Sequence, residues 1–372
     1  MAAVAQHPPV APIPGAAPTT FPPTTMRLGT YALLAALCLA ASIVAAGGCA
    51  SMDHAEIGRR LLAIEKNAPL RGAVQEREVE CVLDGAKTRG VHRWTRFGDP
   101  NGPTVVLVHG TPSSMVTWTE VVHGLGGKPG LAATCDVWTP EIVGHGTCPT
   151  TLDACTFQAC ADWLSSFLDM HDLRDATLVG QSYGGEFAWR CALDRPDRVS
   201  RLVLMSSAGL PRKDGEWLPE EEKMREWGFL AYIGWMLNSP QRVAPALQLH
   251  FQSPLPAWRV DEVCLSVSNR HNWRAMVDLA RDEEGRRAAE LGSIRQPTLL
   301  LWGEKDVAYR PERFAVGFRD AIPGSTLLLA PGSGHYPQEE VPQFVVDALA
   351  AFAHGRPLPE GASQQALPAS SR

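Results

Sequence analysis

The sequence predicts an α/β fold with a mostly parallel central sheet and helices on both faces. Short apolar runs alternate with longer amphipathic segments from residue 78 onward. The run Val105-Val106-Leu107-Val108, for example, is typical of a strand that is buried on both faces. Because a helix-length segment separates most of these runs, consecutive strands are expected to lie parallel in one sheet.

The expected elements follow one another in a regular order. Two short strands come first, at 78–83 and 91–97, with the turn-forming pair Asp84-Gly85 between them. Buried strands are expected at 105–108, 135–140, 176–179, 202–205, 298–302 and 326–329. Helices are expected at 115–125, 156–171, 184–193, 311–321 and 341–353.

One long interval interrupts this order. Residues 211–292 contain helical patterns and many aromatic side chains but no convincing strand, so they are expected to form a helical cap inserted into the core. The core is then divided into residues 78–210 and 293–354. Residues 49–77 are interpreted as a linker and N-terminal segment, and residues 355–372 as a disordered tail.

The N-terminal region is typical of an export signal. Residues 1–25 are rich in Pro, Ala and Thr and are expected to be disordered; Met26 is an alternative start, in which case they are not translated. Residues 26–48 combine Arg27, an apolar run at 31–46 and a Gly pair before Cys49. This pattern resembles a bacterial lipobox and predicts a lipid on Cys49 that anchors the chain to the cell envelope. A simple cleaved signal, giving a periplasmic or secreted protein, and an uncleaved anchor helix are the alternatives.

The composition excludes several classes of partner. The chain has 34 Lys and Arg against 40 Asp and Glu, a net charge of −6, and no long basic run. Such a surface does not favour nucleic acid, so a small-molecule partner is expected. The nine cysteines have no spacing typical of a zinc site, and we expect no metal and no cofactor.

Ser182 lies in the motif Gly180-Gln181-Ser182-Tyr183-Gly184, directly after a predicted strand and before a predicted helix. A turn this tight needs the two glycines, and it exposes the serine hydroxyl above the edge of the sheet. In this strand–turn–helix context the motif predicts a nucleophile.

A serine nucleophile needs a histidine base and a carboxylate that orients the base. His335 follows the last predicted strand in a Gly-rich loop, and Asp306 follows the strand before it. The order Ser, Asp, His along the chain favours Asp306 and His335 as these partners, with Glu304 as the alternative acid. Either carboxylate could instead cap the next helix.

An oxyanion also needs hydrogen-bond donors. The Thr111 amide, after the strand at 105–108, and the Tyr183 amide, after Ser182, are expected to form an oxyanion hole. We interpret His109 as structural and His145 as part of a turn, and assign neither of them a proton-transfer role.

Together these motifs resemble the α/β-hydrolase fold family. They are HGTPSS (109–114), GHG (144–146), GQSYGG (180–185), WGEKD (302–306) and GHYPQEE (334–340). HGTPSS and the helical insertion are similar to the cap-bearing branch, which contains haloalkane dehalogenases, epoxide hydrolases and esterases. Dehalogenases and epoxide hydrolases of that branch use Asp as nucleophile, whereas this chain has Ser182, so the resemblance implies acyl transfer.

The expected activity is hydrolysis of a small or medium hydrophobic carboxylic ester through an acyl-enzyme. Trp227 and Trp235 of the cap are expected to line the acyl pocket. The same triad could instead serve C–C bond hydrolysis, lactone opening or perhydrolysis, since the fold does not fix the substrate. A lipoprotein that only binds a ligand is the remaining alternative.

Overall fold

A computed structural model describes residues 51–361, which form one compact unit. Its centre is an eight-stranded sheet with the order β1-β2-β4-β3-β5-β6-β7-β8. Strands β1 and β2 pair antiparallel, as do β2 and β4, and all other neighbours are parallel. The strands are β1 Gln75–Leu83, β2 Ala86–Gly98, β3 Thr104–Val108, β4 Asp136–Pro140, β5 Ala176–Gln181, β6 Val199–Met205, β7 Thr298–Gly303 and β8 Thr326–Ala330.

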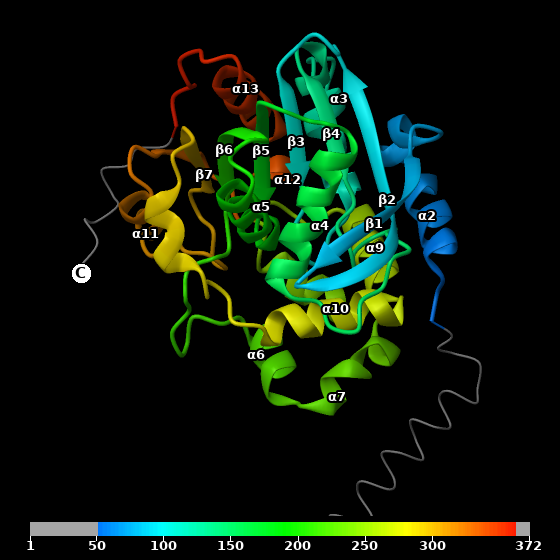
Figure 1. Ribbon diagram of the computed structural model, residues 1–372. Coiled ribbons are helices and arrows are strands. Elements are labelled where there is room, and N and C mark those ends of the chain that lie inside the picture. The colour runs from blue at the N-terminus through cyan, green and yellow to red at the C-terminus, as the bar shows by residue number, and fades with distance from the viewer. Residues whose placement is uncertain (1–50, 362–372) are drawn as a thin grey trace, which may run out of the picture. The chain divides into compact units, whose positions relative to one another are not determined.

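Helices cover both faces of the sheet, as predicted (Figure 1). In β3, Val106 and Val108 point into one apolar core, and Val105 and Leu107 point into the other. This alternation follows from the two-residue period of a strand and explains why the run is apolar throughout. The first core contains α4 Phe157–Met170, α5 Tyr183–Asp194 and α11 Phe314–Ala321; the second contains α3 Thr119–His123 and α13 Pro342–Ala353.

The segment before the sheet differs from the expected linker. It forms the helix α2 His54–Ala63 and the 3₁₀ helix η1 Glu65–Leu70. The Asp53 side chain accepts a hydrogen bond from the Glu56 amide at 2.7 Å and so begins α2, while Ile57 and Leu61 are fully buried. The charged residues around these two apolar positions obscured the helical period in the sequence.

The predicted insertion is helical and has no strand between Met205 and Thr298, a stretch that lies within the described residues. Its helices gather at one end of the sheet (Figure 1). They are α6 Pro219–Glu226, α7 Phe229–Tyr232, η4 Gly234–Leu237, α8 Pro240–Gln248, α9 Ala257–Val267 and α10 Arg270–Arg281. We refer to them together as the cap. Four further 3₁₀ or short helices are η2 Met115–Trp118, η3 Leu131–Ala133, η5 Ala288–Ser293 and α12 Pro337–Glu340.

Among residues 51–361, no helix has the length and apolar character required to cross a bilayer. The predicted leader, the predicted signal at 26–48, Cys49 and residues 362–372 lie outside the described residues.

His92 of β2 is a buried histidine that packs against α4. Its ring stacks on Trp163 at a centroid distance of 3.8 Å, and its Nε2 lies 2.8 Å from the Ser166 hydroxyl. Because that hydroxyl donates to the Trp163 carbonyl, it accepts from His92 Nε2. Nδ1 has no hydrogen-bond partner among the described residues, so a second proton there would be uncompensated. Burial lowers the pKa of His92 to about 3.

We therefore predict that His92→Phe reduces the loss of stability in acid. The unfolded histidine binds its proton near pH 6.5 and the folded one only near pH 3, so stability falls as the pH drops below 6.5. One such group contributes about 1.4 kcal/mol per pH unit, or about 2 kcal/mol between pH 6.5 and 5. Denaturant unfolding at several pH values measures this slope in the parent and the variant. If the free energy of unfolding depends on pH equally in the parent and the variant, His92 does not titrate in this way.

Candidate active site

Ser182 occupies a sharp turn between β5 and α5. Its backbone has φ 54° and ψ −128°, in the region that non-glycine residues rarely adopt. Close backbone contacts enforce the turn: a Cβ on Gly180 would lie 2.2 Å from the Gly184 carbonyl oxygen, and one on Gly184 would lie 2.3 Å from the His109 carbonyl oxygen. A side chain at either position would collide with the backbone, so both residues must be glycine.

The structure brings the predicted Ser182, His335 and Asp306 together. His335 Nε2 lies 3.0 Å from Ser182 Oγ, and His335 Nδ1 lies 2.9 Å from Asp306 Oδ2. Because a carboxylate oxygen only accepts, Nδ1 carries the proton and Nε2 is left to accept from the serine hydroxyl. Asp306 is fixed in turn, since its Oδ1 accepts from the Ala308 and Tyr309 amides at 2.9 and 3.0 Å. All three side chains are buried.

Glu304, the alternative acid, is placed elsewhere. Its Oε2 accepts a hydrogen bond from the Gly332 amide at 2.7 Å, in an exposed position at the base of the loop that carries His335. It thus braces this loop and makes no hydrogen bond to the His335 imidazole. The geometry favours Asp306 as the orienting carboxylate.

The Thr111 and Tyr183 amides flank the serine from two elements, the turn after β3 and the first turn of α5. Neither amide donates a hydrogen bond to any of the described residues. The Thr111 hydroxyl is bound to His145 Nε2, and His145 Nδ1 donates to the Val143 carbonyl at 2.9 Å. Burial lowers the pKa of His145 to about 4, so the neutral ring can accept from Thr111 and hold its turn in place.

His109 has the structural role that we expected from the sequence. Its Nδ1 lies 3.0 Å from the Gly110 carbonyl, and its Nε2 lies 3.0 Å from Glu141 Oε1. Glu141 also accepts from the Met115 amide and from the Thr147 amide and hydroxyl, so this buried carboxylate joins the turns after β3 and β4. The imidazole faces this network and makes no hydrogen bond to Ser182.

Sequence analysis missed four residues that surround His335. The Tyr309 ring stacks on the imidazole at 5.5 Å, and the Gln181 side chain donates to the His335 carbonyl at 3.0 Å. From the cap, the His250 carbonyl accepts from the His335 amide at 2.8 Å, and its ring lies 5.3 Å from the His335 ring. Burial, together with the nearby His335, lowers the pKa of His250 to about 4. The fourth missed residue, Glu340, binds the loop itself.

The Glu340 carboxylate joins the cap to the His335 loop. Its Oε2 accepts from the Gly334 amide at 2.7 Å, and its Oε1 accepts from the Gln252 and Ser253 amides at 2.6 and 3.2 Å. The only sequence signal for this role is the position of Glu340, close behind His335 in GHYPQEE. One side chain thus fixes both the loop and the cap segment next to it.

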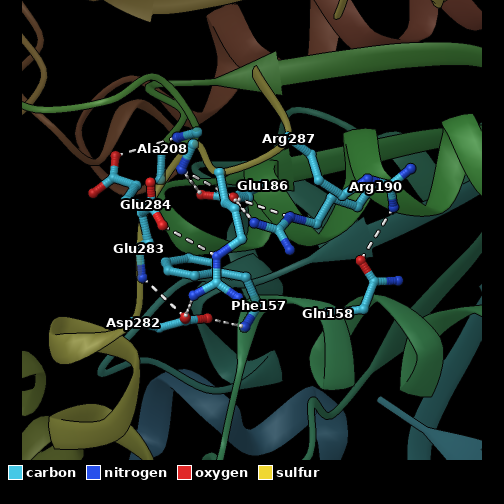
Figure 2. A network of polar contacts seen from close by, with 12 residues as sticks. Phe157, Gln158, Glu186, Arg190, Ala208, Asp282, Glu283, Glu284 and Arg287 are labelled. Carbon is cyan, nitrogen blue, oxygen red and sulfur yellow. Dashed lines mark hydrogen bonds and ion pairs between the residues drawn. The ribbon is translucent and has the colours of Figure 1, made fainter. Parts of the chain in front are cut away.

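A second buried network fastens the end of the cap to α5 (Figure 2). Glu186 of α5 accepts from the Arg190 guanidinium and from the Gly285 amide, which lies just beyond α10. Nearby, the Asp282 carboxylate accepts from the Phe157 amide at 3.0 Å, and Glu284 accepts from the Gly209 amide at 3.2 Å. The segment just beyond the cap is therefore hydrogen-bonded directly to α5, the helix that follows Ser182.

Of the two aromatics predicted to line the pocket, only the Trp227 side chain is described, and it is largely exposed. Trp227 ends α6 with 52% of its surface exposed, which is incompatible with lining a buried acyl pocket in this conformation. The helical pattern alone did not show which face of α6 meets solvent. The side chain of Trp235 lies outside the described parts of the chain.

Within residues 51–361, no cluster of His, Cys, Asp or Glu side chains has the arrangement needed to hold a metal ion. The cysteines of this part are all free, and the closest pair, Cys155 and Cys160, has its sulfurs 3.5 Å apart.

The sequence pattern of the alpha/beta hydrolase family matches residues 105–348. The chain belongs to this family, and it is a hydrolase.

Three proteins to which this chain is similar differ in their described activities. A mouse sn-1-specific diacylglycerol lipase is 25% identical over 68% of this chain and 82% of its own length. A membrane phospholipase A, described as a bacterial virulence factor, superposes with a TM-score of 0.62 at 21% identity, over 89% of this chain and 99% of its own. A haloalkane dehalogenase from Bradyrhizobium elkani has a TM-score of 0.61 at 20% identity, over 76% and 98% of the two chains. The two structural matches establish the shared fold.

Proposed function

We propose that this protein is a serine hydrolase that cleaves hydrophobic carboxylic esters through a Ser182–His335–Asp306 triad. The observation that carries this proposal is the continuous pair of hydrogen bonds from Ser182 Oγ through His335 to Asp306. This is the arrangement in which an imidazole can take the serine proton while a carboxylate stabilises the charge that forms.

The reaction has two halves. In the first, His335 Nε2 removes the Ser182 proton as Oγ attacks the ester carbonyl, and the same proton then passes to the departing alcohol. In the second, His335 takes a proton from water, the hydroxide opens the acyl-enzyme, and Ser182 regains its proton as the acid leaves. The Thr111 and Tyr183 amides stabilise the oxyanion in both halves.

The identity of the nucleophile supports ester cleavage over dehalogenation. A serine that attacks a carbonyl gives an acyl-enzyme that water can open, whereas dehalogenases of this fold use an aspartate. The similarity to a diacylglycerol lipase supports an ester of a fatty acid as the substrate class. The buried site, under aromatic rings such as Tyr309, also fits an apolar acyl group.

We predict that Ser182→Ala lowers the turnover of a short-chain p-nitrophenyl ester by about 10⁴-fold or more, because the triad acts as a unit. The variant should remain folded, since the change removes only one oxygen. Steady-state rates, with circular dichroism as the folding control, provide the measurement. Parent-like hydrolysis by a folded Ser182→Ala protein would remove this serine from the mechanism.

Asp306→Asn and Glu304→Gln form a matched pair. We predict that the first lowers kcat by about 10⁴-fold, because an amide can orient the His335 imidazole in the wrong tautomer. The second should leave kcat nearly unchanged, since Glu304 contacts only the Gly332 amide of the loop. If Glu304→Gln is the more damaging change, the assignment of the acid is wrong.

We propose further that the protein is exported and held at a membrane by a lipid on Cys49. The basis is the sequence pattern of residues 26–49. Mass spectrometry of the mature N-terminus in a bacterial host should find a diacylated Cys49, and Cys49→Ser should abolish it. An unmodified N-terminus beyond Cys49, or an intact leader, would contradict lipidation.

A further inference from the structure

We propose that an exposed apolar face of the cap docks on a lipid bilayer and that the enzyme draws its ester from that bilayer. This face, which we call the cap patch, is formed by Trp227, Phe229, Leu230 and Leu237. The second half of the inference rests on the proposed ester hydrolysis and narrows its substrate class to lipid-soluble esters.

The cap patch is concentrated in a short piece of the chain. Its side chains are 52%, 63%, 46% and 47% exposed, and they lie on α6, α7 and η4, which contact one another in sequence. The remaining large exposed apolar side chains of the described chain are scattered; they are Val82, Leu125, Leu249 and Val307. Isolated exposed apolar residues are ordinary, whereas a cluster that includes a Trp and a Phe indicates an interaction surface.

The cap patch is the outer face of a segment whose inner face is firmly held. Ala231 of α7 is buried, and its carbonyl accepts a hydrogen bond from Trp273 Nε1 of α10 at 2.6 Å. The Arg225 guanidinium reaches from α6 to the Ala280 carbonyl at 2.7 Å. The exposed rings thus belong to a fixed surface, and α6 and α7 cannot bury them by turning over without breaking these contacts.

The chemistry of the cap patch fits the interface of a bilayer. Trp, Phe and Leu are the side chains that interfacial helices insert among acyl chains. Exposed charged residues of both signs lie on α6 next to the cap patch in the sequence, with Lys223 beside Glu222 and Glu226. Such a mixed rim suits zwitterionic headgroups, and it lacks the single sign that an oppositely charged protein partner would require.

The start of the described chain independently brings the cap close to the predicted anchor. Ser51 Oγ accepts from the Arg270 amide at 3.0 Å, and the Met52 carbonyl accepts from the Asn269 side chain at 2.7 Å. Both partners lie at the beginning of α10, the helix that holds α7. Ser51 is two positions after Cys49 and five positions after the end of the apolar run at 46, so a fully extended chain spans at most about 7 Å and about 18 Å. Anything that anchors either point holds the cap near the membrane.

Two consequences follow for the site. An ester that leaves the bilayer meets the cap before it meets the sheet. The cap segment around His250 and Gln252 is in turn hydrogen-bonded to His335 and to Glu340. Substrates that partition into acyl chains, such as long-chain glycerol esters, are therefore concentrated where the cap can take them up.

The first test is photo-crosslinking of the full chain in phosphatidylcholine vesicles. The photoreactive amino acid p-benzoylphenylalanine is placed at Phe229 and, as a matched control, at Leu125, which are 63% and 54% exposed. Leu125 directly follows α3 and the turn residue Gly124, and α3 lies at the opposite end of the molecule from α7 (Figure 1). We expect lipid adducts by mass spectrometry at 229 and few at 125. Equal yields at the two positions, or adducts at 229 with protein alone, would overturn the proposal. Ser182→Ala should not change the yield, so docking is tested separately from hydrolysis.

The second test uses the double variant Phe229→Ser, Leu230→Ser of the full chain, with Leu125→Ser as control. We expect kcat/KM for p-nitrophenyl palmitate in vesicles to fall about tenfold or more, because the lost apolar contact weakens docking. Turnover of dissolved p-nitrophenyl butyrate should stay within about twofold of the parent rate, since these side chains are exposed whereas the triad is buried. An equal loss on both substrates, or no loss on either, would refute bilayer delivery. If neither the parent nor any variant hydrolyses either ester, but lipid adducts still form at position 229, the proposed ester hydrolysis is refuted. The proposed docking of the cap patch on the bilayer is then still supported.

Discussion

The left-handed backbone of Ser182 is the constraint on which the site depends. A residue at φ 54° between a strand and a helix projects its side chain above the sheet edge, but only if the flanking chains can approach without Cβ atoms. Gly180 allows the close approach to the Gly184 carbonyl in the first turn of α5, and Gly184 allows the close approach to the His109 carbonyl just after β3. The same close contact brings the Thr111 turn next to the serine, so one backbone conformation positions both the hydroxyl and the donors around it.

The acid and the histidine are placed by an equally tight contact. β7 and β8 are parallel neighbours, and the loops that follow them meet at Gly303, where a Cβ would lie 1.8 Å from the Gly334 carbonyl oxygen. The loop that carries Asp306 and the loop that carries His335 are therefore packed backbone against backbone. Tyr309 then covers the imidazole on one side, and the cap reaches it through the His250 carbonyl.

The sequence predicted those features that depend on neighbours along the chain. Strands appeared as apolar runs, and Ser182 was found because its motif has a local steric reason. Asp306 and His335 could be predicted because each follows a strand in a parallel sheet, whose strand ends meet at one edge. The roles of Glu340 and His250 could not be predicted, because Glu340 contacts residues about 90 positions away and His250 acts through its backbone carbonyl. The exposure of Trp227 was missed for a related reason: a short amphipathic segment does not reveal which of its faces meets another helix.

The shared carboxylate of Glu340 has a consequence for the timing of events. A cap that lifts at residues 250–253 must release the Gln252 and Ser253 amides, and with them the carbonyl that receives the His335 amide. Opening the site therefore removes one restraint on the imidazole at the same moment that it admits solvent. Movement of this cap segment and the positioning of the catalytic base are therefore coupled, because the same residues contact both Glu340 and the His335 backbone.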